Sequence, residues 1–375
     1  MIHVMHAIAD PSMGGAAVLL RTLFSQGSSR EFSLSLLAPQ DALPPKALFP
    51  GATLIPLPLS SRQGLSPKDM ARLLGCLRQR KPDILHTHGW FAPRLAASLL
   101  PPKDLPLRIS TKHCAAQPPA FPLLYRRVTN MTVATGENAY RLLLSQGIPR
   151  RELSLFPNCP RSLTRDPAIR QKMRQRYGLS PTTVAVGLCA RLAPIKGQDT
   201  LLSAAAQLRD ADMHFFLLGD GPDKERLSSR ICKEKLTNVQ LLGEWQDPAP
   251  FYQMLDISLS CSLGSETSSL ALGEGLSLSL PTLASDIPGN RLLLGDGGLF
   301  YPPGDSLSLA EALRQMCAAL PRYREAAEKR YRLLPTPEGT CRLYEGLYRT
   351  LLADRRKYGE RRGAKNASFP SPEKT

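Results

Sequence analysis

The feature that most constrains this chain is a repeated alternation of short apolar strands with amphipathic helical patterns. Such alternation predicts parallel sheets covered by helices on both faces, because a strand reaches its parallel neighbour only through a crossover. The fold class is therefore α/β, with ligands expected at the carboxyl ends of the strands. The predicted strands fall at residues 2–9, 32–37, 54–56, 84–88, 107–111, 131–135, 153–156, 184–188, 214–218, 239–242, 257–260, 281–285 and 299–301.

The length of 375 residues is more than twice that of a usual domain, which predicts two domains. A proline-rich stretch with a charged helix, residues 158–179, is the expected connection between them. A last helix is expected over residues 340–353, and the basic, polar segment 355–375 is expected to be disordered.

Cysteine usage and hydropathy indicate a cytoplasmic protein with reduced thiols. The eight cysteines form no C-x-x-C pair and no regular spacing, and no secretory signal is evident. No apolar run reaches the ~18–20 residues that span a bilayer, so no transmembrane segment is expected.

The net charge of +16 is concentrated in two parts of the chain. Residues 1–161 carry 19 Lys and Arg against 8 Asp and Glu (+11), residues 355–375 carry 7 against 2 (+5), and the rest is balanced. A basic domain predicts an anionic partner, which the charge alone leaves open between phospholipid, a pyrophosphate-linked substrate and nucleic acid. A generally basic proteome would produce the same charge.

Two glutamates, Glu266 and Glu274, lie eight residues apart around the start of a helix predicted over residues 269–278. Eight residues is slightly more than two helical turns, so both carboxylates can face one ligand. Ionised carboxylates are strong acceptors and suit a ligand rich in hydroxyl groups. Two solvated glutamates on an exposed helix would show the same spacing. The helix start carries three residues of the N-cap type, Thr267, Ser268 and Ser269.

Two strand-to-helix loops carry residues that suit an anionic ligand. Gly14 and Gly15 follow the first strand, where they allow backbone to approach a phosphate or a sugar at a helix N-terminus. Arg191 and Lys196 follow the strand at 184–188, where two cations can grip a diphosphate while helix amides assist. Taken alone, the glycines also fit a tight turn, and the cations also fit a solvated loop.

Histidines are placed on strands and at strand ends. His86 and His88 share a strand face but lack a further set of metal ligands, and His113 follows the next strand, where loop residues perform chemistry. His3 and His6 lie within the first strand, where a structural role is expected.

Several motifs follow one another in a fixed order, and together they resemble the retaining GT-B glycosyltransferases of family 4. They read R-L-x-P-x-K-G, a strand ending in G-D-G-P, S-x-x-S-E-x7-E, P-x-L-A-S-D-I-P-G-N and G-L-F-Y-P-P-G-D. The match is specific over residues 184–320 and looser in the N-terminal half, where Gly14, Gly15, His88 and His113 carry it.

The resemblance implies two Rossmann-like β/α/β domains that face each other across a cleft. The acceptor-binding domain would span residues 1–160 and the nucleotide-sugar-binding domain 161–339. The helix at 340–354 would cross back to the first domain, ahead of the basic tail at 355–375.

The resemblance also implies a role for each matched residue. Arg191 and Lys196 would bind the donor diphosphate beside Gly14 and Gly15, and Glu274 would accept hydrogen bonds from the ribose. Glu266 and His113 would act at the donor sugar as the catalytic pair. Thr267, Ser268 and Ser269 would form the loop that faces the sugar.

The sequence departs from the family pattern at two places. A glycine and an aromatic residue usually follow the first glutamate, whereas Thr267 and Ser268 stand here and make the sugar-facing loop more polar. The connector usually reads N-G-V-D, whereas Asn158-Cys159-Pro160-Arg161 stands here and lacks the glycine.

A metal-independent mechanism is expected, because the cations would stabilise the leaving diphosphate. The single D-x-D, Asp210 to Asp212, lies at the end of its sheet opposite the ligand side, so no metal site is predicted. No further carboxylate is placed as a nucleophile, which favours front-face substitution with retention of anomeric configuration.

The resulting hypothesis is a cytoplasmic hexosyltransferase without a cofactor that works peripherally at the inner face of the membrane. The donor would be a nucleotide-sugar, and the acceptor a lipid-linked saccharide or polysaccharide of the cell envelope, as in lipopolysaccharide assembly. The membrane contact is expected at residues 118–128, where apolar and aromatic groups adjoin Arg126 and Arg127. A GT-B epimerase is one alternative. A basic nucleic-acid-binding protein is another, although only 6% of residues are aromatic and no nucleic-acid partner is expected.

Overall fold

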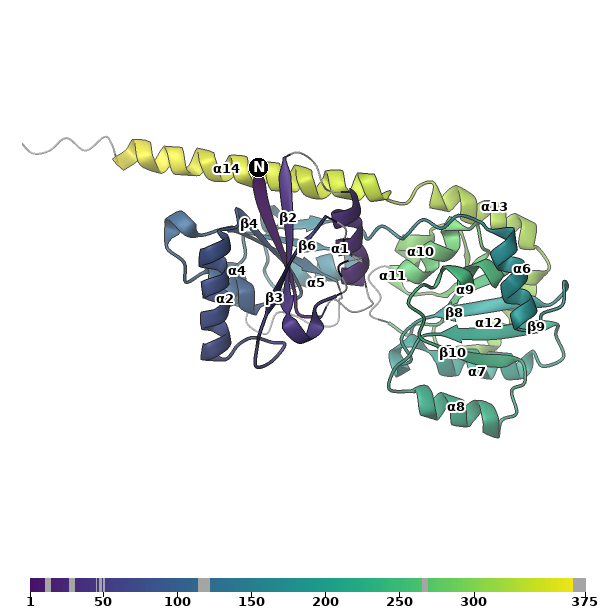
Figure 1. Cartoon of the computed structure of the whole chain (residues 1–375). Helices are drawn as coiled ribbons and strands as arrows, with labels where there is room; N and C mark the ends of the chain where they lie inside the picture. The colour runs from purple at the N-terminus through teal and green to yellow at the C-terminus, as the bar shows by residue number, and fades with distance from the viewer. Residues whose placement is uncertain are drawn as a thin grey trace, which may run out of the picture.

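The computed structural model contains two parallel β-sheets, each flanked by helices and formed by one half of the chain (Figure 1). It describes residues 1–10, 15–26, 31–44, 46, 49, 51–113, 122–264 and 269–366. The seven-stranded sheet has the order β3-β2-β1-β4-β5-β6-β7, and the six-stranded sheet has the order β10-β9-β8-β11-β12-β13. Both are doubly wound α/β sheets, as the alternation of the sequence predicts.

The strands lie close to their predicted positions, and three of them match the predicted bounds. They are β1 (Ile2–Ile8), β2 (Phe32–Pro39), β3 (Thr53–Leu57), β4 (Ile84–His88), β5 (Leu107–Lys112), β6 (Met131–Ala134), β7 (Leu153–Leu155), β8 (Val184–Cys189), β9 (Met213–Leu218), β10 (Val239–Gly243), β11 (Ile257–Ser260), β12 (Thr282–Ser285) and β13 (Leu299–Tyr301).

Helices connect these strands and cover both faces of each sheet (Figure 1). They are α1 (Gly15–Gln26), α2 (Pro67–Arg80), α3 (Ala92–Ala97), α4 (Pro122–Arg127), α5 (Glu137–Ser145), α6 (Pro167–Arg176), α7 (Gln198–Gln207), α8 (Lys224–Lys233), α9 (Ala249–Met254), α10 (Leu270–Ser277), α11 (Pro288–Leu294), α12 (Ser306–Cys317), α13 (Leu320–Tyr331) and α14 (Pro337–Asn366). The short 3-10 turn η5 (Pro194–Lys196) precedes α7.

Alternating side chains of the first sheet enter different cores, since successive residues of a strand point to opposite faces. Met5, Ala7 and Leu85 pack under α2 and α3. Val4 and Ile84 pack on the other face, under α1 and α14. His6, His86 and His88 have the parity of this second group, so they point toward α1 and α14.

The helix α14 runs back along the N-terminal domain (Figure 1). Cys341, Tyr344 and Tyr348 are buried in the core that also contains residues of α1 and of strands β1, β2 and β4 to β6. The helix extends to Asn366, although disorder is expected from residue 355 onward. Arg, Lys, Glu and Ala are favourable helix residues, and no proline follows Pro337 within the helix. The high charge of this segment therefore does not prevent the helix from continuing. Residues 367–375 lie outside the described part.

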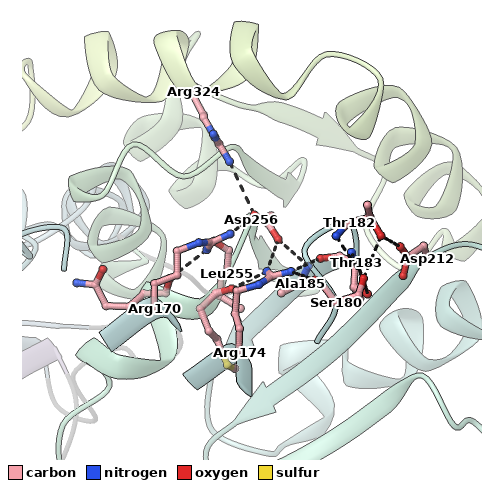
Figure 2. Close-up of polar contacts among 12 residues, drawn as sticks. Arg170, Arg174, Ser180, Thr182, Thr183, Ala185, Asp212, Leu255, Asp256 and Arg324 are labelled. Atoms are coloured by element: carbon pink, nitrogen blue, oxygen red, sulfur yellow. Dashed lines mark hydrogen bonds and ion pairs between the residues drawn. The ribbon is translucent and has the colours of Figure 1, made fainter. Parts of the chain in front are cut away.

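Asp256 lies at the start of β11 and forms ion pairs with arginines of two helices, α6 and α13 (Figure 2). Its Oδ1 lies 2.6 Å from Nη2 of Arg170 and 3.8 Å from Nη2 of Arg324. Its Oδ2 lies 2.9 Å from Nη1 of Arg174 and accepts from the backbone N–H of Ala185 at 3.0 Å. Removing one partner of such a buried pair typically costs about 3–5 kcal/mol, so this group stabilises α6 and α13 against the sheet.

The described residues contain no helix that is both long and apolar enough to cross a membrane. Seven of the eight cysteines lie in the described part, and each of these seven is a free thiol. The remaining cysteine, Cys114, lies outside it.

Candidate functional site

A cavity of about 200 Å³ lies where the carboxyl ends of strands from both sheets meet. In the second sheet it adjoins the ends of β8 and β11, the neighbouring strands at which the strand order reverses. Ligands of doubly wound folds bind at this reversal, because the loops there diverge and leave a crevice. The lining residues are Gly15, His113, Asn158, Leu188, Cys189, Ala190, Lys196, Leu259, Ser260, Cys261, Ser262, Ser269, Leu270 and Ala271.

Lys196 is held at the cavity by the rigid backbone of the loop between β8 and α7. The loop turns at Gly197, whose φ of 67° is a left-handed conformation that favours glycine. A Cβ at Gly197 would clash with the carbonyl oxygen of Cys261 at the end of β11. The N–H of Leu263 donates to the carbonyl of Ile195 at 2.8 Å, which ties the loop to the same strand end.

The G-D-G-P motif supports this loop from behind. Gly219 and Gly221 have φ values of 139° and 159°. A Cβ on Gly219 would clash with the carbonyl oxygen of Ala190, and a Cβ on Gly221 with that of Leu192. The N–H of Leu192 donates to the Asp220 carbonyl at 2.9 Å. The glycines of this motif therefore allow close backbone packing beneath the cationic loop and do not line the cavity.

The N-terminus of α10 faces the cavity through Ser269, Leu270 and Ala271. Ser269 is the N-cap residue, yet its side chain makes no capping hydrogen bond to the helix. The N-terminus of α10 and Lys196 thus border the same cavity, an arrangement that suits the phosphates of a ligand.

Glu274 lies one turn into α10, buried to 7% exposure, and does not line the cavity. Burial raises the pKa of this carboxyl, while the charge of Arg161 and the nearby Tyr252 hydroxyl oppose that effect. Nε of Arg161 lies 3.7 Å from Oε1 of Glu274, and Nη2 of Arg161 lies 2.8 Å from Oδ1 of Asp247. Arg161 therefore orients the carboxylate that the sequence predicts to bind ribose.

The predicted site residues are only partly brought together. Gly15, His113, Lys196 and Ser269 line the same cavity. Arg191, on the same loop as Lys196, is exposed and is not among the residues that line this cavity, and its carbonyl accepts from Nε2 of Gln198 at 2.9 Å. The predicted site residues Gly14, Glu266, Thr267 and Ser268 lie outside the described residues.

The aspartate pair rejected as a metal site lies far along the sheet from the cavity. Asp212 immediately precedes β9, at the strand ends opposite the cavity. Its Oδ2 accepts from the Thr182 hydroxyl at 2.7 Å, next to the Asp256 group (Figure 2).

Four histidines form one cluster that reaches from the cavity into the N-terminal domain. Nε2 of His113 lies 3.1 Å from Nδ1 of His88, and Nε2 of His88 lies 3.0 Å from Nδ1 of His6. His86 stacks on His88 with ring centroids 4.6 Å apart. Its ring nitrogens contact the Tyr348 hydroxyl and a threonine of β5, each at 2.7 Å.

Burial keeps this histidine cluster neutral. It lowers the pKa of His6 to about 3 and that of His113 to about 4. The pKa values of His86 and His88 also lie well below 6.5, first because of burial and then because each lies beside the other histidines.

Sequence reasoning missed two features of this site. His6 was expected to be structural, and it is buried; what the sequence did not predict is that β1 pairs with β4 and places His6 directly opposite His86. The signal was available, because the first strand of a doubly wound sheet commonly lies beside the fourth. The second feature, the pairing of Arg161 with Glu274, joins residues 113 positions apart and has no local signal.

The fold and the site define a class of protein. Two doubly wound domains with a shared cavity at their strand ends are the GT-B architecture, and two family matches agree with it. Residues 13–186 match the family described as Glycosyltransferase Family 4, and residues 181–319 match Glycosyl transferases group 1. The chain therefore belongs to the GT-B glycosyltransferases of the family 4 type.

Individual curated relatives match this chain only in part and at low sequence identity. The chain is 29% identical over 276 residues to an exopolysaccharide phosphotransferase of Streptomyces coelicolor, covering 71% of this chain and 28% of that protein. It is 31% identical over 126 residues to a phosphatidyl-myo-inositol mannosyltransferase of Mycobacterium leprae, covering 32% and 33%. The chain thus spans about a third or less of the length of these two curated relatives.

A solved structure with the same fold contains a nucleotide-sugar. Anabaena HepE in complex with UDP-glucose has a TM-score of 0.76 and 16% identity, with 94% of this chain and 100% of that chain covered. At this identity the likeness establishes the shared fold, and the ligand belongs to that protein.

Proposed function

We propose that this protein moves a hexosyl group from a nucleotide-sugar to a lipid-linked saccharide or polysaccharide acceptor in cell-envelope glycan assembly. The observation that carries the proposal is the cavity that Lys196, the N-terminus of α10 and His113 line together from both domains. The glycosyltransferase family favours transfer over the epimerase and nucleic-acid alternatives.

In the proposed complex, the donor diphosphate lies against Lys196 and the N–H groups of α10, with Arg191 and Gly14-Gly15 nearby. Glu274 accepts from the ribose, His113 and Glu266 act at the donor sugar, and Thr267, Ser268 and Ser269 contact that sugar. A relative named for phosphatidyl-myo-inositol and another named for exopolysaccharide support a lipid or polysaccharide acceptor.

The proposed chemistry is positioning with charge stabilisation. The bond between the anomeric carbon and the phosphate oxygen breaks, and the electron pair stays on the nucleoside diphosphate. The acceptor hydroxyl oxygen bonds to the same face of the sugar and gives its proton to the leaving diphosphate. Lys196 and the helix amides stabilise the charge that grows on the leaving group. Retention and metal independence are parts of this proposal.

The function is tested by incubating the protein with a panel of nucleotide-sugars and extracted envelope lipids or glycans. Release of a nucleoside diphosphate with one donor, together with label transfer from its sugar to the acceptor, is expected. Label found only in an epimerised free nucleotide-sugar would contradict transfer.

Replacing Glu274 by Ala should weaken binding of the nucleoside diphosphate. The ribose would lose a charged acceptor worth roughly 1.5–3 kcal/mol, or about 10- to 150-fold in Kd. Calorimetric titration measures this, with Glu311→Ala on the exposed face of α12 as a matched control. Equal affinity in both variants would contradict the ribose assignment.

Chelation should leave activity intact. In the proposed mechanism the cations at the cavity take the part that a divalent ion plays in metal-dependent transferases. The initial rate of diphosphate release is measured before and after EDTA treatment. Activity that EDTA abolishes and Mn²⁺ restores would contradict metal independence.

We also propose that this cytoplasmic protein binds peripherally to the inner membrane face through α4. Leu123 is 83% exposed and Leu124 is 36% exposed beside the exposed Arg127, on the half of the chain that carries a net charge of +11 (19 basic minus 8 acidic residues). Tyr125 was expected at the same boundary, but it is 6% exposed and belongs to the core.

Anionic liposomes should therefore bind the protein at low salt. Each cation near the surface contributes about 1 kcal/mol, and salt screens this attraction. Co-sedimentation at low and high salt measures it, with Leu123→Ser expected to weaken it. Equal binding to neutral liposomes would contradict the electrostatic attraction.

A further inference from the structure

A continuous chain of imidazole rings leads from the cavity into the N-terminal core. His113 lines the cavity, and its Nε2 contacts Nδ1 of His88 at 3.1 Å. Nε2 of His88 in turn contacts Nδ1 of His6 at 3.0 Å. His88 and His6 are only 4% and 1% exposed, so water does not compete for these contacts.

The two contacts couple the proton positions of the three rings. A neutral imidazole carries one N–H donor and one acceptor nitrogen. Where His6 donates from Nδ1, His88 accepts at Nε2 and must donate from Nδ1, so His113 accepts at Nε2 and carries its proton on Nδ1. Where His113 donates from Nε2, every step reverses. Only these two arrangements satisfy both hydrogen bonds.

The chain is held in place from the side. His86 stacks on His88 with ring centroids 4.6 Å apart, and its ring lies against that of His6 at 5.0 Å with a tilt of 36°. The Tyr348 hydroxyl of α14 contacts Nδ1 of His86 at 2.7 Å, and the Thr111 hydroxyl contacts its Nε2 at 2.7 Å. Both nitrogens of His86 are thereby engaged, and its ring forms a fixed platform for the chain.

A metal centre explains the cluster less well. His6, His86 and His88 each offer a nitrogen within 4.8 Å of the others. Their ring planes, however, are stacked or tilted by only 24° to 36°. Metal coordination needs in-plane lone pairs that converge on one point, whereas stacked rings direct their lone pairs in roughly parallel planes.

We propose that His88, backed by His6, is a positioning residue that fixes the ring orientation and the tautomer of His113 at the reaction centre. The inference deepens the proposed function and rests on it, because His113 is taken to face the donor sugar. Fixing one tautomer decides whether Nδ1 of His113, the ring nitrogen that does not contact His88, donates or accepts a hydrogen bond.

Two substitutions of His88 separate positioning from packing. Asparagine places a polar atom near the position of Nδ1 and keeps the contact with His113, whereas glutamine places one near Nε2 and keeps only the contact with His6. His88→Gln should lower kcat by about 10- to 100-fold, taking as a guide the loss that follows when a metal-ligating histidine loses the partner that orients it. KM for the donor should change little, and His88→Asn should stay closer to wild type in kcat. Equal losses of kcat in both variants would mean a packing role and overturn the proposal.

A second measurement needs neither turnover nor a stable variant. In the full chain labelled with ¹⁵N-histidine, His113 should show one protonated and one unprotonated ring nitrogen, with scalar coupling across the hydrogen bond to His88. Two results would overturn the proposal: ring-nitrogen signals of His113 that are averaged between the two tautomers, or stoichiometric binding of added Co²⁺ by the histidine cluster. If no nucleotide-sugar gave activity in the assay, the proposed function would be rejected. The NMR spectrum would still show whether His88 fixes the tautomer of His113.

Discussion

Lowering the pH from 7 to 5 is expected to remove most of the stability of this protein. The cause is the cluster of His6, His86, His88 and His113, whose rings are neutral in the folded chain. Burial holds the pKa of His6 at about 3 and that of His113 at about 4, and the other two also lie well below 6.5. Unfolding exposes all four to water, where they bind protons near pH 6.5.

The sign of the effect follows from proton linkage. A histidine whose folded pKa is depressed contributes its full stability above the unfolded value of about 6.5 and loses it as the pH falls toward the folded pKa. Each contributes about 1.4 kcal/mol per pH unit, so four approach roughly 5 kcal/mol per unit below pH 6. The whole free energy of unfolding of a domain is about 5–15 kcal/mol. The raised pKa of Glu274 acts in the opposite direction, but one group offsets only part of the effect of four histidines.

Urea unfolding at several pH values, followed by circular dichroism, measures this dependence. The slope of unfolding free energy against pH gives the number of protons taken up. Replacing His6 by Asn should reduce it by about 1.4 kcal/mol per pH unit, whereas His214→Asn, at a partly exposed position of β9, should change it less. A slope of less than one proton between pH 7 and 5 would contradict neutral burial of the cluster.

The fold was largely predictable, because alternation and turn residues are local signals. The bounds of β4 (Ile84–His88), β11 and β13 were predicted correctly. The helices α11 and α13 were missed, since Pro288 and Pro321 in their first turns resemble loop residues although proline is favourable there.

The lining of the candidate site was predictable only where a residue follows the end of a strand. Lys196, His113 and Ser269 needed no more than the rule that parallel strands present their ends together. The histidine chain required the order of strands as well, because His6 meets His88 only if β1 lies beside β4. The ion pair of Arg161 with Glu274 depends on the path of the connector, and no periodicity in the sequence encodes that path.

Replacing Lys196 by Ala is expected to lower kcat about 10²- to 10³-fold, the usual cost of removing one group that stabilises developing charge. The ammonium lies in the cavity at the end of β11, where the leaving diphosphate would gain its charge. Because that charge grows in the transition state, kcat should fall more than donor affinity. Initial rates at saturating donor and acceptor, with calorimetric Kd values for the nucleoside diphosphate, separate the two.

Folding should hardly respond to the same change. The loop is shaped by Gly197, by the Leu263 N–H donating to the Ile195 carbonyl and by the glycines behind it, all of which remain in the variant. A melting temperature within about 2 °C of wild type is therefore expected. Lys224→Ala, which removes an exposed ion pair with Asp220 on the adjoining loop, is the matched control and should retain activity. Because Arg191 is exposed and outside the cavity, Arg191→Ala tests whether donor binding recruits it: a kcat loss like that of Lys196→Ala would place it on the diphosphate. A Lys196→Ala variant that melts early but turns over normally would make this lysine structural and move the leaving-group site elsewhere.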